Sequence, residues 1–174
     1  FFGKNQLIIN LITYYKVTPS SRPIFQHKMT AYSQQYSQLK IRNPNTTPDP
    51  RLSFDKDLHN LIHQCRHKHQ EILLLGDFNE NIEDKSSGLK CIMEKFQLLD
   101  IFHHKIGHSQ FNTFQSGSAK IDFALATTPK VAAAITTCGY KAFSRRLVSD
   151  HRGLFIDFNT KLSNRYTREV IIVV

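Results

Sequence analysis

The sequence lacks the features that mark several classes of protein. Its 174 residues contain no tryptophan and three cysteines, Cys65, Cys91 and Cys138. The cysteines are odd in number, widely spaced and without a Cys-x-x-Cys pair, which argues against a disulfide framework and against a structural zinc site. We therefore expect reduced thiols in an intracellular setting.

Long apolar runs are also missing. The longest, such as residues 7–12 and 170–174, hold five or six residues, whereas a membrane-spanning helix needs about 20. This excludes a membrane-spanning helix, and the 40% hydrophobic content is that of one globular domain. Phe1 is not an initiator and no targeting signal follows it, so we expect a piece of a longer protein.

Acidic residues are scarce relative to basic ones. The chain has 14 Asp and Glu against 23 Lys and Arg, which gives a formal net charge of +9. Such a charge favours polyanionic partners through long-range attraction, and nucleic acid is the commonest of them.

The spacing of apolar residues predicts strands that alternate with helices. The predicted strands are residues 6–15, 71–76, 121–125 and 153–158, and the predicted helices are residues 25–40, about 53–69 and 89–96. A proline-rich loop at 43–50 separates the first two helices. This alternation favours an α/β layered domain, and the apolar run 170–174 is either an edge strand or a fragment of downstream sequence.

Polar side chains lie at the ends of three predicted strands. Asp77 and Asn79 follow a buried strand and are two residues apart, so an extended backbone points them to the same side. Asp122 lies on a second strand, and Asp150 and His151 come directly before a third. An imidazole with several carboxylates suits metal-assisted phosphoryl chemistry, in which a cation offsets the charge that develops on phosphate.

Three ordered motifs carry a resemblance to a known family. Gly76-Asp77-Phe78-Asn79, then Ile121-Asp122-Phe123, then Ser149-Asp150-His151 resemble the endonuclease/exonuclease/phosphatase superfamily. The closest likeness is to endonuclease domains of non-LTR retrotransposons, carried by residues 14–17, 30–35 and 149–157, and the resemblance runs from about residue 7 to residue 162.

The resemblance implies a fold and a domain division. The parent fold is a four-layer α/β sandwich whose amino-terminal half, with the Glu that is the main metal ligand, has no counterpart in this sequence. Residues 1–162 would form the partial domain and residues 163–174 a tail of unknown role. Half of a two-sheet sandwich would expose the apolar face meant for the other sheet, so we expect association or instability.

The resemblance also implies a role for each matching residue. Asp77 would orient or deprotonate the attacking water, Asn79 would hold the phosphate, and His151 would contact it. Asp122 would fix the His151 ring, and Asp150 would help to bind Mg²⁺ or, alternatively, Mn²⁺. Tyr15 would lie near the scissile phosphate, although the adjacent Tyr14 leaves the register open.

Other charged residues receive simpler interpretations. Lys141, Arg145, Arg146 and Arg152 flank the Ser-Asp-His motif, where they form either a DNA-binding rim or ordinary basic surface. Glu80, Glu83 and Asp84 are expected in a solvated loop. His59, His63 and His67 recur every four residues on the second helix, with His69 beyond them, and are expected on its solvated flank rather than at a metal.

The sequence thus predicts a Mg²⁺-dependent DNA endonuclease of a retroelement, fused to further retroelement domains and located in the nucleus with its substrate. Two alternatives stay open. One is a phosphatase acting on a small phosphate ester, because the motifs do not distinguish DNA from other phosphate esters. The other is an inactive remnant without the metal-binding Glu that binds nucleic acid through its positive charge.

Overall fold

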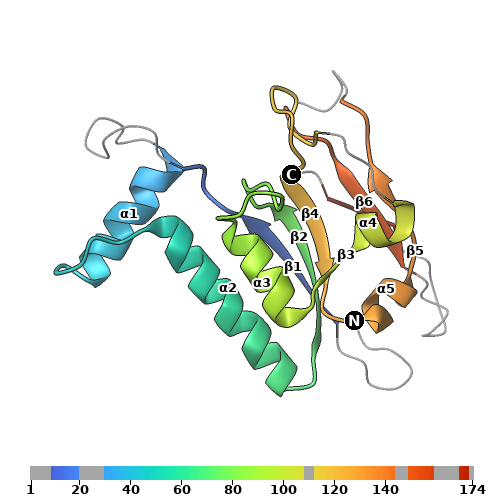
Figure 1. Ribbon diagram of the computed structural model, residues 1–174, viewed down its shortest axis with the longest axis horizontal. Coiled ribbons are helices and arrows are strands. Elements are labelled where there is room, and N and C mark those ends of the chain that lie inside the picture. The colour runs from blue at the N-terminus through green and yellow to red at the C-terminus, as the bar shows by residue number, and fades with distance from the viewer. Residues whose placement is uncertain (1–8, 20–29, 108–111, 144–148, 159–168, 173–174) are drawn as a thin grey trace.

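The computed structural model describes residues 9–19, 30–107, 112–143, 149–158 and 169–172. Helices cover one face of a sheet whose other face meets a second sheet (Figure 1). The strands are β1 Ile9–Tyr15, β2 Glu71–Asp77, β3 Leu99–Asp100, β4 Asp122–Ala126, β5 Ile135–Tyr140, β6 Leu154–Phe158 and β7 Glu169–Ile172. The helices are α1 Ala31–Arg42, α2 Pro50–His67, α3 Gly88–Phe96, α4 Ile101–Ile106 and α5 Pro129–Ala134.

Strands of the first sheet run in the order β1-β2-β4-β3, with β1 parallel and β4 antiparallel to β2. The second sheet has the order β5-β6-β7 and is antiparallel. This register sets Tyr15 and Asp122 on either side of Asp77, the last residue of β2. The chemistry-bearing residues of three strands therefore meet at one end of the first sheet.

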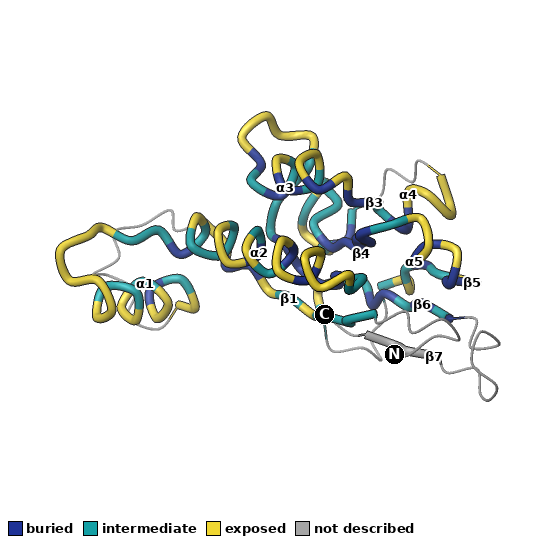
Figure 2. The backbone as a smooth tube through the Cα atoms, turned by 90° about the horizontal axis from the view of Figure 1, so that it is seen from below, coloured by how far each residue is buried: buried dark blue, intermediate teal, exposed yellow. Residues whose placement is uncertain are grey.

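Two apolar cores follow from the alternation of side chains along β2. Ile72 and Leu74 face α2 and α3, while Leu73 and Leu75 face the second sheet. Both sets are fully buried, as a strand covered on both sides requires. In Figure 2, β4 is buried in the centre of the molecule, whereas α1 is largely exposed at its far end.

The prediction of an exposed sheet face is wrong for the described residues. The second sheet comes from this same chain, and Leu154, Ile156 and Phe158 of β6 pack against the first sheet. The reason is that β5, whose apolar alternation is weak, has no strong signal in the sequence and yet belongs to the sheet that covers this face. In the run 170–174, the edge-strand interpretation is confirmed for the part inside β7, which pairs with β6.

Two predicted helix boundaries differ from the structure. The second helix begins at Pro50 rather than near Ser53, because the Asp49 side chain accepts the N–H groups of Arg51 and Leu52 and proline suits a first turn. The first helix runs over Ala31–Arg42, and the part predicted at 25–29 lies outside the described residues. Among the described helices, none is long and apolar enough to cross a membrane.

Candidate active site

Asp77 ends β2 with its carboxylate held from both sides. It is 2% exposed and lies on the face of β2 that meets the second sheet. The backbone N–H of Asn79 donates to Asp77 Oδ1 at 2.8 Å, and Asn79 Nδ2 donates to Asp77 Oδ2 at 2.8 Å. Asn79 adopts a left-handed φ of 47°, which a short polar side chain tolerates. The turn thus fixes the direction in which the carboxylate points.

The second hydrogen of the Asn79 side-chain amide also forms a hydrogen bond within the protein. Through it, Nδ2 donates to the backbone oxygen of Lys16 at 2.7 Å. A contact from this amide to phosphate, as the resemblance implies, therefore requires one of the two bonds to be exchanged. In the structure Asn79 positions Asp77.

Asp122 and His151 meet across the two sheets. Asp122 begins β4 and is fully buried, whereas His151 lies in the segment that enters β6. His151 Nδ1 is 3.1 Å from Asp122 Oδ2, and its Nε2 is 3.8 Å from Asp77 Oδ2. The imidazole therefore stands between two carboxylates, with one ring nitrogen fixed and the other toward Asp77.

Burial raises the pKa of both carboxylates. Removal from water raises the pKa of Asp77, the bonds from Asn79 lower it, and the Asp122 charge raises it further, to about 6 in all. Burial also raises the pKa of Asp122, against the lowering effect of Thr113 and His151. Asp77 is thus poised near neutral pH, where an acid or base exchanges protons most usefully.

These three residues can also hold a metal ion. Asp77, Asp122 and His151 each offer one ligand atom, and the three atoms lie within 4.8 Å of one another. Two adjacent buried carboxylates with raised pKa values gain most from a nearby cation, and carboxylate oxygens suit hard divalent ions. The donor set therefore fits a divalent cation.

Tyr14 and Tyr15 point in opposite directions from β1. Tyr14 packs between Phe54 and Phe78 with ring centroids 5.6 and 5.8 Å away, and burial raises its pKa well above the ordinary value. Tyr15 lies beside Asp77 in the register and is 52% exposed. Of the two tyrosines, Tyr15 is thus the one whose position agrees with a place near a substrate.

The predicted metal ligand Asp150 lies outside the three-residue cluster. It is exposed, and its backbone oxygen accepts the N–H of Gln115 at 2.7 Å. Its charge nevertheless reaches Asp122 and raises the pKa of that residue. A role for Asp150 at a metal stays a prediction.

Part of the predicted basic rim can be located. Arg152 follows His151 and donates from Nε to the backbone oxygen of Asn112 at 2.9 Å. Lys141 is exposed, with Nζ 4.5 Å from the centroid of the Phe155 ring. Arg145 and Arg146 lie outside the described residues.

The sequence did not predict an ion-pair cluster that lies next to the turn of Asp77 and Asn79. Lys16 is fully buried and its Nζ lies 2.5 Å from both Asp55 and Glu80, while Arg51 reaches Glu80 at 2.7 Å. The solvated-loop interpretation is wrong for Glu80, whose side chain is 11% exposed, and right for Glu83 and Asp84. Lysine is ordinarily exposed, so no pattern in the sequence marks Lys16 as buried.

The exposure expected of the recurring histidines is found at His63 and His67 of α2 and at His69 just after it. His59 differs, because its ring packs 4.9 Å from Phe96.

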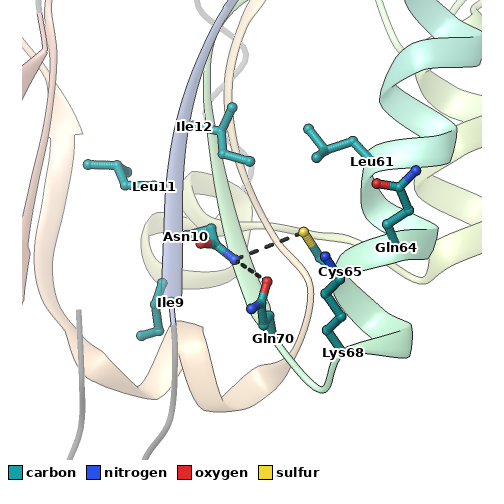
Figure 3. Close-up of a pocket in the computed structure, with 9 residues that line it drawn as sticks. All are labelled: Ile9, Asn10, Leu11, Ile12, Leu61, Gln64, Cys65, Lys68 and Gln70. Atoms are coloured by element: carbon teal, nitrogen blue, oxygen red, sulfur yellow. Dashed lines mark hydrogen bonds between the residues drawn. The ribbon is translucent and has the colours of Figure 1, made fainter.

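Two cavities lie apart from the three-residue cluster. One, of about 520 Å³, lies between the start of β1 and the end of α2, where Asn10 donates to Gln70 at 3.1 Å beside Cys65 (Figure 3). By the register of β1 with β2, this is the end of the sheet opposite Asp77. The other, of about 690 Å³, is lined by residues that include Asn81, Met93 and Lys120.

Comparison with known proteins gives a likeness in structure and none in sequence. No family model and no curated protein sequence matches the chain. A solved structure of the 3′ phosphatase NExo from Neisseria, bound to a product DNA hairpin, superposes with a TM-score of 0.52 at 18% identity and covers 85% of this chain. The match spans 60% of the solved chain. The predicted fold class, an α/β sandwich of the endonuclease/exonuclease/phosphatase type, is confirmed.

Proposed function

We propose that this chain carries the catalytic groups of a divalent-metal-dependent phosphodiesterase of the endonuclease/exonuclease/phosphatase superfamily, and that its substrate is DNA. The observation that carries the proposal is the His151 imidazole standing between the buried carboxylates of Asp77 and Asp122. Fold likeness to a DNA-bound 3′ phosphatase supports it, as does the net charge of +9.

Each of the three residues has a defined task in phosphodiester hydrolysis. Asp77, the buried carboxylate that faces Nε2 of His151, orients the attacking water and takes its proton. Asp122 holds the Nδ1 side of His151, so that Nε2 is presented to a phosphate oxygen and an imidazolium offsets the charge that develops there. Asn79 keeps the Asp77 carboxylate aimed at the water.

A divalent cation completes the proposed site. Asp77 and Asp122 would hold it, with the predicted ligand Asp150 nearby, and Mg²⁺ or Mn²⁺ suits oxygen ligands. When bound, the ion supplies electrostatic stabilisation of the negative charge on the phosphate.

We further propose that the enzyme is the endonuclease of a retroelement. The support is the sequence likeness of residues 14–17, 30–35 and 149–157 to that branch. We expect the protein in the nucleus, where its DNA target would lie, and further retroelement domains would be fused to it. Tyr15 would contact DNA near the scissile phosphate, and Arg145, Arg146 and Arg152 would contact the flanking backbone.

Nicking of supercoiled plasmid DNA in the presence of Mg²⁺ tests this proposal. We expect Asp77→Ala and His151→Ala to abolish nicking and His63→Ala, an exposed change on α2, to leave it unchanged. Cleavage that survives both site variants would show that the site is assigned wrongly. Salt-sensitive DNA binding without any cleavage would favour the inactive remnant instead.

A phosphatase is the second candidate, favoured by the 3′ phosphatase among solved structures. The two activities differ in product. Release of inorganic phosphate from a 3′-phosphorylated oligonucleotide or an inositol phosphate, without nicking, would establish a phosphatase. Nicking of closed circular DNA without phosphate release would establish an endonuclease.

A further inference from the structure

We infer that Thr113 is a positioning residue that fixes Asp122 and His151 relative to each other across the two sheets. The inference rests on the proposed function only in naming this carboxylate–imidazole pair as working groups. Thr113 itself is fully buried and lies in the segment before β4, outside every motif that marks the site in the sequence.

On one side, the Thr113 side chain anchors the start of β4. Its Oγ1 accepts the backbone N–H of Ile121 at 2.9 Å and that of Asp122 at 3.1 Å. Both donors lie at the start of β4, where the pairing of this strand with β2 begins at Asp122 and Asp77. The hydroxyl thereby sets the backbone position from which the Asp122 carboxylate projects.

On the other side, the Thr113 backbone holds the segment that carries His151. Its carbonyl oxygen accepts the N–H of Arg152 at 2.8 Å. The next residue, Phe114, forms a β-bridge with His151, and the two rings lie 5.1 Å apart. Gln115 then donates its N–H to the Asp150 oxygen at 2.7 Å. The segment 113–115 thus contacts His151 and both of its neighbours in the chain.

The need for such a link follows from the topology. Asp122 belongs to the first sheet, whereas His151 enters β6 of the second. A relative shift of the sheets by a few tenths of an ångström would lengthen the 3.1 Å contact between Nδ1 and Oδ2. Thr113 bonds directly to both segments and so couples the position of the ring to that of the carboxylate.

Thr127 provides a matched control at the opposite end of β4. It is 3% exposed, and its Oγ1 accepts the N–H of Ile72 at 2.8 Å and donates to Glu71 at 2.7 Å. It therefore resembles Thr113 in type, burial and bonding to a strand end. It differs in lying away from His151.

The test compares Thr113→Val, Thr113→Ser and Thr127→Val in the full 174-residue chain. The readouts are the ¹⁵N shifts of the His151 ring, which report the hydrogen bond at its Nδ1, and amide hydrogen exchange at Ile121 and Asp122. We expect Thr113→Val to move the Nδ1 shift toward that of an imidazole free in water and to give at least tenfold faster exchange at both amides. Thr113→Ser, which keeps the hydroxyl, should resemble wild type.

Four outcomes decide the inference. A wild-type His151 signature in Thr113→Val would overturn it, and so would an equal change in Thr127→Val. If the valine variant does not fold, Thr113→Cys, with a weaker acceptor of similar size, should give an intermediate signature, and a wild-type signature there would overturn the inference. The expected ring changes in a protein whose wild type cleaves no phosphate ester would sustain the inference and refute the proposed function.

Discussion

Lys16 and Glu80 form an ion pair of 2.5 Å that ties the end of β1 to the loop after β2. The backbone N–H of Lys16 also donates to the backbone oxygen of Asp77 at 2.8 Å, in the turn that carries Asp77 and Asn79. Glu80 further accepts the N–H of Leu89 and thereby joins α3 to the same turn. The turn that carries Asp77 and Asn79 is therefore stabilised by this ion pair.

Replacing Glu80 should destabilise the protein in a pH-dependent way. Burial alone would raise the pKa of Glu80, but the bonds from Lys16, Leu89 and Ser87 outweigh it, and the pKa lies below the ordinary 4.5. The stabilisation is therefore complete above pH 4.5 and is lost as the pH falls through the folded-state pKa. At pH 7 we expect Glu80→Gln to cost about 2 kcal/mol by urea denaturation.

The exposed Glu83 of the same loop supplies the control for this measurement. Glu83→Gln should change the free energy of unfolding by less than about 0.5 kcal/mol. A Glu80→Gln effect that stays constant down to pH 2 would show that the ionised carboxylate is not its source.

Asp77→Asn should remove activity without loss of stability. Burial raises the pKa of Asp77 from 3.8 to about 6, so the folded state holds this proton more tightly than the unfolded chain does. That stabilisation is complete below pH 3.8 and lost as the pH rises through 6. At pH 7.5 the neutral Asn should therefore raise stability by about 1 kcal/mol, since it keeps one of the two acceptor oxygens.

Thermal unfolding at pH 7.5 and at pH 4 checks this prediction, because the gain should shrink at the lower pH. Asp57→Asn, an exposed change on α2, should show neither the gain nor the loss of nicking. A variant less stable than wild type at pH 7.5 would contradict the prediction.

Mg²⁺ should stabilise the protein through the Asp77 and Asp122 carboxylates. An ion that binds only the folded state adds its binding free energy to stability, and about 1 kcal/mol corresponds to a rise in Tm of about 2–4 °C for a chain of this size. We expect this rise in wild type on addition of Mg²⁺, its reversal by EDTA, and none in Asp77→Ala. An equal rise in the variant would place the ion elsewhere.

Gly76 should tolerate no side chain. It has a φ of +149°, and an added Cβ would lie 2.0 Å from the backbone oxygen of Tyr14 on the paired strand. Gly76→Ala must separate β1 from β2 immediately before Asp77, at a cost we expect to exceed about 3 kcal/mol. Circular dichroism melting would detect it, with Gly107→Ala as the comparison, because Gly107 shares a positive φ, +82°, while its Cβ meets open space, so that only the Gly76 variant adds the clash. Equal melting curves would contradict the expected clash.

The elements that the sequence predicted are those with strong local signals. The apolar run before Asp77 and the helical spacing of Leu89, Ile92 and Phe96 reappear as β2 and α3. The convergence of strand ends was also predictable, because the motifs lie where buried strands begin or end. The helix start at Asp49-Pro50 also has a local signal, an Asp at the N-cap followed by Pro at the first helical position.

Other features depend on contacts between residues far apart in the chain. Lys16 is buried only because Asp55 and Glu80, distant in sequence, meet it. Strand β5 has exposed threonines and a glycine, so its apolar alternation is weak. Thr113 has no local signal either, because its hydrogen bonds connect the start of β4 in one sheet to the segment that enters β6 in the other.

The bond between Asp122 and His151 also has a consequence for the order of folding. Both partners of Asp77 in the site come from later, sequence-distant segments, and His151 arrives only when the second sheet docks on the first. Contacts of high sequence separation form late because a long loop must close before they can stabilise anything. On dilution from denaturant, the helix content of α2 and α3 should return first, and the reactive geometry should be the last part of the molecule to mature.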